Sequence, residues 1–287
     1  MGRHKGLALV TGASSGIGRE TAIKLTREGF QVIAVARRKD RLEELAKTHP
    51  HIIAKPLDLS QPEEVEDFYG ELHQRTDPVT TLINNAGYSI RGGLEDVSLS
   101  AARRLFEVNL FALIRITQAC LPGMRRLRQG TIVNLSSIVG KFAFPFSGVY
   151  AASKHAVEAV SDSLRMECRP FGIRVITIRP GPIASEFNDA ATKMTGDLMA
   201  RTDPDYKPVY QASGAGLGKL FSKISIPGPE LIAEVIVEAV LSDSPKPVYT
   251  AGPLVEEIYR PRLEMDDEGF DQFLSGLTGL KDFKATD

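Results

Sequence analysis

The chain has 287 residues, 43% hydrophobic and 25% charged, which is enough for one large domain or two small ones. Its 35 basic and 36 acidic side chains nearly cancel, which argues against a nucleic-acid partner, because such proteins carry a clear basic excess. Two cysteines outside any CxxC pair exclude a disulfide scaffold, and five scattered histidines offer no spacing for a bound metal such as zinc.

Short apolar runs alternate with longer amphipathic stretches along the first half of the chain. The pattern predicts strands at residues 7–10, 32–36, 52–57 and 81–84, and helices at 17–28, 40–48, from 60 onward and at about 101–128. Ser60 is predicted to cap the third helix, because Pro62 follows in the first turn and Glu63 lies three residues after the serine.

The alternation continues through the second half. It predicts strands at residues 131–135, 174–178 and 247–250, and helices at 151–169 and 230–241. Strands separated by helices imply right-handed crossovers, so we expect a doubly wound α/β fold with a mostly parallel seven-stranded sheet and helices on both faces. Residues 184–228 break the rhythm, which is typical of a functional lid or of partial disorder.

The first predicted strand runs into a glycine-rich turn, TGASSGIG, at residues 11–18. Such a turn brings backbone N–H groups close to a phosphate, and the following helix N-terminus favours the anion. The glycine spacing differs from GxGxxG, and no Lys-Ser or Lys-Thr follows as in a P-loop. The turn also contains GxSxG, the nucleophile elbow of α/β hydrolases, centred on Ser14. A hydrolase needs its acid and then its histidine after the serine, and the last histidine is His155, so we favour dinucleotide binding.

The residues after the second strand bear on the choice of nicotinamide cofactor. An acidic residue there holds the ribose 2′-hydroxyl of NAD, whereas arginine accommodates the 2′-phosphate of NADP. Arg37 and Arg38 follow the strand at once, and planar guanidinium groups suit a phosphate. We therefore expect NADP(H) in preference to NAD(H). Asp40 could reverse this preference, and the alternative interpretation is that both arginines only solvate the start of a helix.

Tyr150 and Lys154 open a predicted helix, one turn apart on the same face. A tyrosine titrates at about pH 10, too high for acid–base catalysis near neutrality, and a nearby ammonium group lowers that pKa. The polar segments at 84–87 and 134–137 end the fourth and fifth strands, and ligands of a parallel sheet collect at this carboxyl edge. These features together predict one site.

The set TGASSGIG, NNAG at 84–87, Asn109, Ser137, YAASK at 150–154 and Pro180-Gly181 resembles the short-chain dehydrogenase/reductase family over residues 5 to about 185, and more loosely to 252. The resemblance implies a Rossmann fold and hydride transfer between a nicotinamide cofactor and a ketone, aldehyde or alcohol. It implies Tyr150 as the general acid–base, Ser137 as the hydrogen-bonding partner of the substrate oxygen, and Lys154 as the group that binds the nicotinamide ribose and lowers the pKa of Tyr150. Asn109 would help to hold a water linked to Lys154, although without the resemblance it reads as a satisfied buried amide.

The resemblance also implies a cofactor-binding set along the carboxyl edge: Gly12, Ser14, Ser15, Gly16, Ile17, Gly18, Arg37, Arg38, Asp58, Asn85, Ala86, Gly87, Tyr150, Lys154, Pro180, Gly181, Ile183 and Ser185. In this set Asp58 would lie beside the adenine and Asn85 beside a ribose. The substrate would contact Ser137, Val139, Phe144 and Tyr150. Ser185 stands where the family often has threonine.

Apolar and aromatic side chains follow Ser137 and recur in the 184–228 segment, namely Met194, Leu198, Met199, Tyr206, Tyr210, Leu217 and Phe221. We expect them to enclose a bulky hydrophobic carbonyl substrate, steroid-like, retinoid-like or acyl. They would serve equally as core or subunit contacts. Residues 105–171 also resemble the family's steroid- and retinoid-active members.

The remaining expectations concern the whole protein. We expect one catalytic domain over residues 1–287, with a substrate-lid insert at about 184–228 and a C-terminal extension at about 253–287. A short N-terminal apolar run and the lack of about 18 uninterrupted apolar residues predict a soluble, cytoplasmic protein without a membrane span. The resemblance implies a homodimer or homotetramer. The alternatives are a catalytically silent dinucleotide sensor on the same fold and, more remotely, a serine hydrolase using Ser14.

Overall fold

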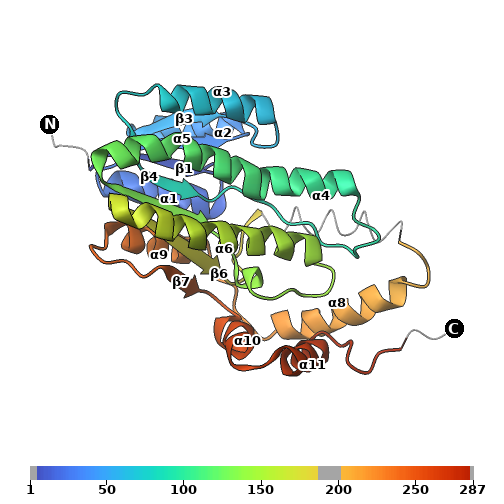
Figure 1. The fold of residues 1–287 in the computed structure, drawn as a ribbon. Coiled ribbons are helices and arrows are strands. Elements are labelled where there is room, and N and C mark those ends of the chain that lie inside the picture. The colour runs from blue at the N-terminus through green and yellow to red at the C-terminus, as the bar shows by residue number, and fades with distance from the viewer. Residues whose placement is uncertain (1–4, 187–201, 285–287) are drawn as a thin grey trace.

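A computed structural model of the chain describes residues 5–186 and 202–284 (Figure 1). Its strands form one sheet in the order β3-β2-β1-β4-β5-β6-β7, with every neighbouring pair parallel. Their bounds are β1 Leu7–Thr11, β2 Gln31–Ala36, β3 Ile52–Pro56, β4 Val79–Asn84, β5 Gly130–Leu135, β6 Ile173–Pro180 and β7 Val248–Ala251. The predicted doubly wound α/β fold is thus confirmed.

Continuous apolar runs form the central strands because both faces of the sheet are covered. Every residue of β1 and of β5 is buried. The strand order reverses beside β1, which pairs with β2 on one side and β4 on the other. In such sheets the crevice outside the carboxyl ends of the strands at this reversal is where ligands bind.

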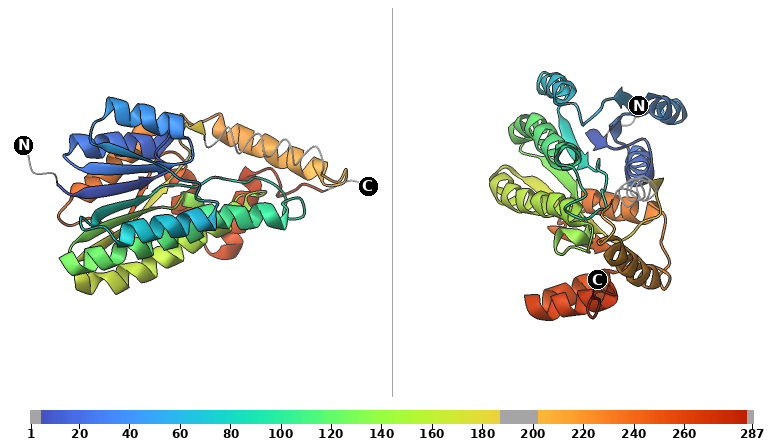
Figure 2. Two further views of the ribbon diagram at one scale, coloured as in Figure 1. Left: turned by 90° about the horizontal axis from the view of Figure 1, so that it is seen from above. Right: turned by 90° about the vertical axis from the view of Figure 1, so that its right-hand side faces the viewer.

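Helices lie on both faces of the sheet, as the end-on view in Figure 2 shows. One core cluster joins side chains of α1 Gly16–Arg27, α2 Lys39–Thr48 and α9 Glu230–Leu241 to the strands. The cluster on the other face uses α3 Pro62–His73, α5 Ala112–Leu127 and α6 Gly148–Cys168. Although α1 and α9 are far apart in the chain, they pack side by side and Lys24 donates to Glu234 at 3.0 Å.

The long helix predicted at 101–128 is interrupted. α4 Leu99–Phe106 is followed by a π-helical turn, η1 Glu107–Phe111, before α5 begins. Taken together, Leu99–Leu127 is long and apolar enough to cross a membrane, but half of its most apolar window is buried inside the protein. A core helix has the same properties, and α5 packs against α3 and β4.

Two local predictions are wrong. Ser60 does not cap α3: the N-cap residue is Gln61, and the Ser60 hydroxyl donates to Asp58 at 2.8 Å. The 184–228 segment is not irregular throughout, because α8 spans Lys207–Phe221. Tertiary contacts stabilise this glycine-containing helix, since a Cβ on Gly216 would lie 2.4 Å from the backbone of Thr278.

The C-terminal residues fold beyond the carboxyl edge of the sheet. They form a π-helical turn, η4 Val255–Tyr259, then α10 Arg260–Glu264 and α11 Asp267–Leu277. Figure 1 shows α8, α10 and α11 gathered at this end of the molecule. A third core cluster joins η4, α8 and α11 to the segment that precedes and begins α6, which places the C-terminal extension beside Tyr150.

Candidate active site

The glycine-rich turn that follows β1 is packed so closely that there is little room for side chains at its glycines. Gly12 and Gly16 have φ angles of +70° and +56°, which glycine adopts without strain. A Cβ on Gly12 or Gly18 would come within 2.7 or 2.4 Å of Nδ2 of Asn85. The turn therefore depends on glycine at these positions to pack against the end of β4.

Asn85 is bonded within the protein. Its Nδ2 donates to the Thr11 carbonyl at 2.9 Å, while Oγ1 of Thr11 accepts the backbone N–H groups of Asn85 and Ala86, both at 3.0 Å. These bonds join the ends of β1 and β4, so Asn85 holds the start of the glycine-rich turn in place. Whether it also lies beside a ribose stays a prediction.

The N-terminus of α1 is open to an anion. Its N-cap residue Ser15 makes no side-chain capping bond, and the first turn contains no acidic residue. Arg38 donates to Oγ of Ser14 at 2.9 Å and to Oγ of Ser15 at 2.6 Å. Backbone N–H groups, hydroxyls and a guanidinium group thus converge here, which fits the phosphates of a dinucleotide. Ile17 packs into the core beneath the turn.

The two predicted arginines differ in position. Arg38 contacts the turn, whereas Arg37 is exposed, and its charge partly offsets the rise that burial causes in the pKa of Tyr88. Arg41, which sequence reasoning missed, lies beside Arg38, and both donate to the carboxylate of Glu186. The signal that could have revealed Arg41 is its spacing, one helical turn after Arg38. The Arg38 and Arg41 hydrogen bonds lower the pKa of Glu186 to about 2.

Asp58 follows β3 at the same edge. Its carboxylate accepts the backbone N–H of Ser60 at 2.9 Å as well as the serine hydroxyl. Burial raises the pKa of Tyr88, the charges of Arg104 and Arg37 lower it, and the charge of Asp58 raises it. Asp58 and Arg37 therefore both lie near Tyr88, a residue that sequence reasoning did not single out.

Ser137 and Tyr150 form the centre of the candidate site. Their side chains are hydrogen-bonded to each other, and Oγ of Ser137 also accepts from the Val139 backbone at 3.3 Å. Burial raises the pKa of Tyr150 to about 12, opposed by the Ser137 bond and by the charge of Arg91. The structure thus brings Ser137 and Tyr150 into contact, while their roles toward a substrate stay predictions.

Lys154 lies near the Tyr150 ring, one helical turn further along α6. Its Nζ lies 5.9 Å from the centre of the Tyr150 ring and donates to the Leu135 carbonyl at 2.8 Å. Burial lowers the pKa of Lys154 to about 8, while the charge of Glu158 raises it. Burial is the largest influence on the pKa of Tyr150 in the protein alone, and the lowering expected from Lys154 stays a prediction.

Asn109 lies in the π-helical turn η1, and both the nitrogen and the oxygen of its side-chain amide form hydrogen bonds within the protein. Nδ2 donates to the Tyr88 carbonyl at 3.0 Å and to Ser153 at 3.1 Å, while Oδ1 accepts the Tyr88 N–H at 3.0 Å. The residue thus joins the loop after β4 to α6. A Cβ on Gly87 would lie 3.1 Å from Oδ1 of Asn109 and 3.6 Å from Nζ of Lys154, so Gly87 borders both side chains.

A buried charge network, missed from the sequence, lies one turn beyond Lys154. Arg179 and Glu158, 8% and 2% exposed, form a two-bond ion pair. Arg179 also donates to the Tyr259 hydroxyl at 2.5 Å, and Lys141 lies 3.5 Å from Glu158. The network connects β6 and α6 to the C-terminal extension.

The segment after β6 is fixed by β7. The N–H of Gly181 donates to Ala251 at 2.8 Å, and a Cβ on Gly181 would lie 1.9 Å from the Pro253 carbonyl. Oγ of Ser137 donates to the Pro180 carbonyl at 3.4 Å, which joins this segment to the Ser137–Tyr150 pair. Ile183 is buried in the core, and Ser185 lies over Gly16, 3.6 Å from where a Cβ would stand.

Apolar side chains of the third core cluster pack around Tyr150. The buried members of this third cluster include Val139 and Phe142, with Phe144 and Phe221 packed against them. The C-terminal helix α11 adds Phe270, 5.7 Å from Phe142 between ring centres, which the sequence did not predict. Met194, Leu198 and Met199 lie outside the described residues.

An aromatic clasp, which we define as Phe146, Tyr206 and Tyr210, fastens α8 to the loops around the site. The Phe146 and Tyr210 rings stack at 3.9 Å, and Tyr206 packs edge-on against both. The Tyr210 hydroxyl donates to Asp96 at 2.6 Å and accepts from the Gly93 N–H. Phe146 has φ of +62°, a strained angle for a residue with a side chain.

The hydrolase alternative finds no support in the contacts of Ser14. Its hydroxyl accepts from Arg38, while His155 is exposed on α6 and its Nδ1 lies 2.9 Å from the carbonyl of Ala151.

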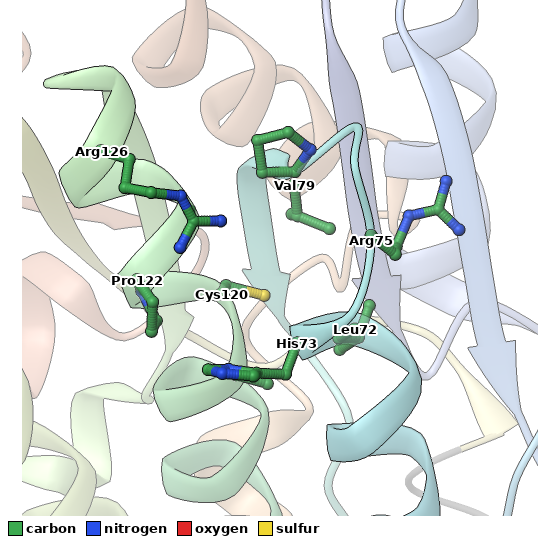
Figure 3. Close-up of a pocket in the computed structure, with 10 residues that line it drawn as sticks. Leu72, His73, Arg75, Val79, Cys120, Pro122 and Arg126 are labelled. Atoms are coloured by element: carbon green, nitrogen blue, oxygen red, sulfur yellow. The ribbon is translucent and has the colours of Figure 1, made fainter.

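A small pocket occurs at the other end of the sheet. Figure 3 shows it between α3 and α5, where His73, Pro122 and Arg126 lie around Cys120. Burial raises the pKa of Cys120 to about 12, which keeps the thiol protonated. This pocket lies beside the start of β4, away from the carboxyl edge.

Comparison with known proteins agrees with this geometry. The family model described as short chain dehydrogenase matches residues 6–196. The chain is 36% identical to the uncharacterized oxidoreductase YbbO of Escherichia coli (strain K12), over 84% of this chain and 83% of that protein. It is 33% identical to retinol dehydrogenase 8 of Homo sapiens, over 83% and 78% of the two chains. A structure of a short-chain dehydrogenase from Sphingobium yanoikuyae in complex with NADPH is similar, with TM-score 0.72, 25% identity and 98% of each chain covered.

Proposed function

Because the chain belongs to the short-chain dehydrogenase family and is an oxidoreductase of that family, we propose that it interconverts a ketone or aldehyde and an alcohol with NADP(H), using Tyr150 as general acid–base. The observation that carries the proposal is the Ser137–Tyr150 hydrogen bond beside the ammonium group of Lys154 at the carboxyl edge. The chemistry that NADP(H) supplies when bound is hydride transfer to or from the substrate carbon.

Each member of the site has a distinct task. Ser137 orients the substrate oxygen beside Tyr150, whose phenol donates its proton to that oxygen during reduction. A pKa raised to about 12 keeps the phenol of the protein alone protonated at neutral pH, which is the form that donates a proton. We propose that the ammonium group of Lys154 lowers this pKa toward the working pH during catalysis. Lys154 stays positively charged below pH about 8 and binds the nicotinamide ribose.

The cofactor preference rests on the arginines beside the glycine-rich turn. Arg38 donates to Ser14 and Ser15, and Arg41 lies next to it, so two guanidinium groups are available for a 2′-phosphate. The NADPH bound by the Sphingobium yanoikuyae protein supports the same preference by similarity. Comparable dissociation constants for NADPH and NADH in the unaltered protein would contradict it.

The substrate is proposed to be bulky and hydrophobic. The apolar cluster around Phe142, Phe144 and Phe270 borders Tyr150, and one relative is a retinol dehydrogenase. A panel of retinoid, steroid, long-chain and small polar carbonyl compounds tests this idea. Turnover of the small polar ketones alone would contradict it.

The decisive experiment measures NADPH oxidation with this panel for the unaltered protein, Tyr150→Phe and Tyr69→Phe. Removing the acid–base group is expected to lower kcat by about 100-fold or more while NADPH still binds. Tyr69 lies on α3 beside Arg115, so its variant controls for the loss of a tyrosine hydroxyl elsewhere. Undiminished turnover in Tyr150→Phe would contradict the assigned mechanism.

We further propose that the protein works in the cytoplasm as a homo-oligomer. Partly buried apolar side chains of the α4–α5 stretch and α6, including Phe106, Ile114 and Val160, are suited to a helix-to-helix subunit contact.

A further inference from the structure

A carboxylate of the chain itself lies against the two arginines beside the glycine-rich turn. Glu186 accepts hydrogen bonds from Arg38 and, at 2.6 Å, from Nη1 of Arg41. The three side chains are 39–49% exposed, so a ligand entering from solvent can reach this ion-paired group.

The protein holds Arg38 from its other side. Its Nε and Nη2 donate to the hydroxyls of Ser14 and Ser15, which leaves Nη1 directed at Glu186. This arrangement fixes the arginine beside the N-terminus of α1 and presents its remaining donor outward. Glu186 binds at that outward side.

The ion pair also bridges two strand ends. Glu186 follows the segment that leaves β6, and the preceding Ser185 lies over Gly16 of the turn. The carboxylate therefore reaches across the carboxyl edge from the β6 side to the arginines that follow β2. A ligand that binds both arginines must meet it.

We propose that Glu186 competes with the 2′-phosphate of NADP(H) for Arg38 and Arg41, and so sets how strongly the protein discriminates between NADP(H) and NAD(H). The inference rests on the proposed function, because it takes the phosphate-bearing cofactor as the ligand of these arginines. Carboxylate and phosphate accept the same charged hydrogen bonds from guanidinium, so one set of donors cannot serve both fully. NAD(H) carries a hydroxyl at this position and leaves the ion pair intact.

The test compares the dissociation constants of NADPH and NADH, followed by the fluorescence of the reduced nicotinamide, in the unaltered protein, Glu186→Gln and Glu66→Gln. Glu66 is a matched control, an exposed carboxylate with two hydrogen bonds from Arg115 on the other face of the sheet. We expect Glu186→Gln to tighten NADPH binding by about two- to five-fold, the scale of exposed ion pairs, and to change NADH binding by less than about two-fold. Glu66→Gln should change neither.

Arg41→Ala tests whether NADPH binding depends on the arginine that Glu186 occupies. It should weaken NADPH binding by about ten-fold and leave NADH binding within about two-fold. The gain from Glu186→Gln should shrink in the Arg41→Ala background, because part of the contested donor set is gone. Matching thermal unfolding curves without coenzyme would show that each variant is folded.

Three results for Glu186→Gln overturn the inference: no change with either coenzyme, equal tightening of both, or weaker NADPH binding. Equal tightening would mean that Glu186 obstructs the adenosine half in general, and weaker binding that it positions the arginines. Binding of NADH but not NADPH in every variant also overturns the competition, yet leaves the oxidoreductase proposal standing. Binding of neither coenzyme by any variant overturns both.

Discussion

Gly18 and Gly70 both lie in helices, but only Gly70 has space around it for the methyl group of an alanine. At Gly18 a Cβ would lie 2.5 Å from the Gly12 carbonyl, whereas at Gly70 nothing lies within 4 Å. Gly18→Ala should therefore destabilise the protein and weaken NADPH binding at least ten-fold. Gly70→Ala should stabilise it by about 0.5–1 kcal/mol, because alanine loses less backbone entropy in a helix. Urea unfolding and coenzyme titration measure both effects, and a stable, fully binding Gly18→Ala protein would contradict the packing argument.

The lowered pKa of Lys154 leads us to expect an upper pH limit for the reduction reaction. Burial lowers its pKa from 10.5 to about 8, so the ammonium form is present below that pH and is lost as the pH rises through it. We expect kcat/KM for NADPH-dependent reduction to fall above pH about 8, while the phenol of Tyr150 stays protonated. Glu158→Gln removes the charge that raises the lysine pKa and should move this limb to lower pH. A profile that stays flat to pH 10 would exclude Lys154 as the titrating group.

At the scale of elements, the helices and strands predicted correctly are those whose signal is local. β1 and β5 are predicted by continuous apolar runs, because both faces of these strands are buried. α9 is predicted by helical periodicity, because its buried residues recur on the side that packs on the sheet. α8 was missed because its glycines argue against a helix, and distant contacts stabilise it instead. Gly216 permits the close approach to Thr278, and Tyr210 bonds to Asp96, 114 residues earlier.

The aromatic clasp provides a test of how α8 is held. Tyr210→Phe keeps the ring that stacks on Phe146 but removes the bonds to Asp96 and Gly93. We expect faster amide hydrogen exchange across residues 207–221 and a several-fold higher KM for the carbonyl substrate, with kcat little changed. Tyr249→Phe, which loses only an exposed bond from Lys246, is the control. Unchanged exchange in α8 would contradict the anchoring role.

The C-terminal extension contributes to stability through the buried charge network. Glu158→Gln leaves Arg179 buried without its counter-charge, and we expect it to lower the free energy of unfolding by about 3 kcal/mol. Tyr259→Phe removes one hydrogen bond to the same arginine and should cost about 1–2 kcal/mol. Urea denaturation measures both values. If Tyr259→Phe costs nothing, the extension is not bound to β6 through this contact.

At the scale of the whole molecule, the position of the site was predictable, while the partners of its charged residues were not. The parallel topology alone brings the ends of β1, β4, β5 and β6 to one edge, so the glycine-rich turn, Ser137 and Tyr150 could be placed together. Glu186 and Arg38 are 148 residues apart, and no local pattern predicts which carboxylate pairs with which arginine. The same holds for Arg179 and Tyr259.

The exposed apolar face of the α4–α5 stretch and α6 leads to a prediction about assembly. Phe111 is 52% exposed next to the cluster of Leu110, Leu113 and Val157. We expect light scattering to show a homo-oligomer and Phe111→Glu to shift it toward monomer. Ile53→Glu, at an exposed apolar position on the edge strand β3, should leave the mass unchanged. A monomeric unaltered protein would contradict the proposal.

The side-by-side packing of α1 and α9 has a consequence for how the chain is made. Helix α1 leaves the ribosome some 200 residues before its neighbour α9. One core face of the sheet therefore stays uncovered until α9 has been synthesised, and its closure depends on contacts of high sequence separation, which form slowly. A chain that stalls before residue 230 lacks Ile232, Ile236 and Val240, buried side chains that α9 adds to this core, and we expect it to bind chaperones.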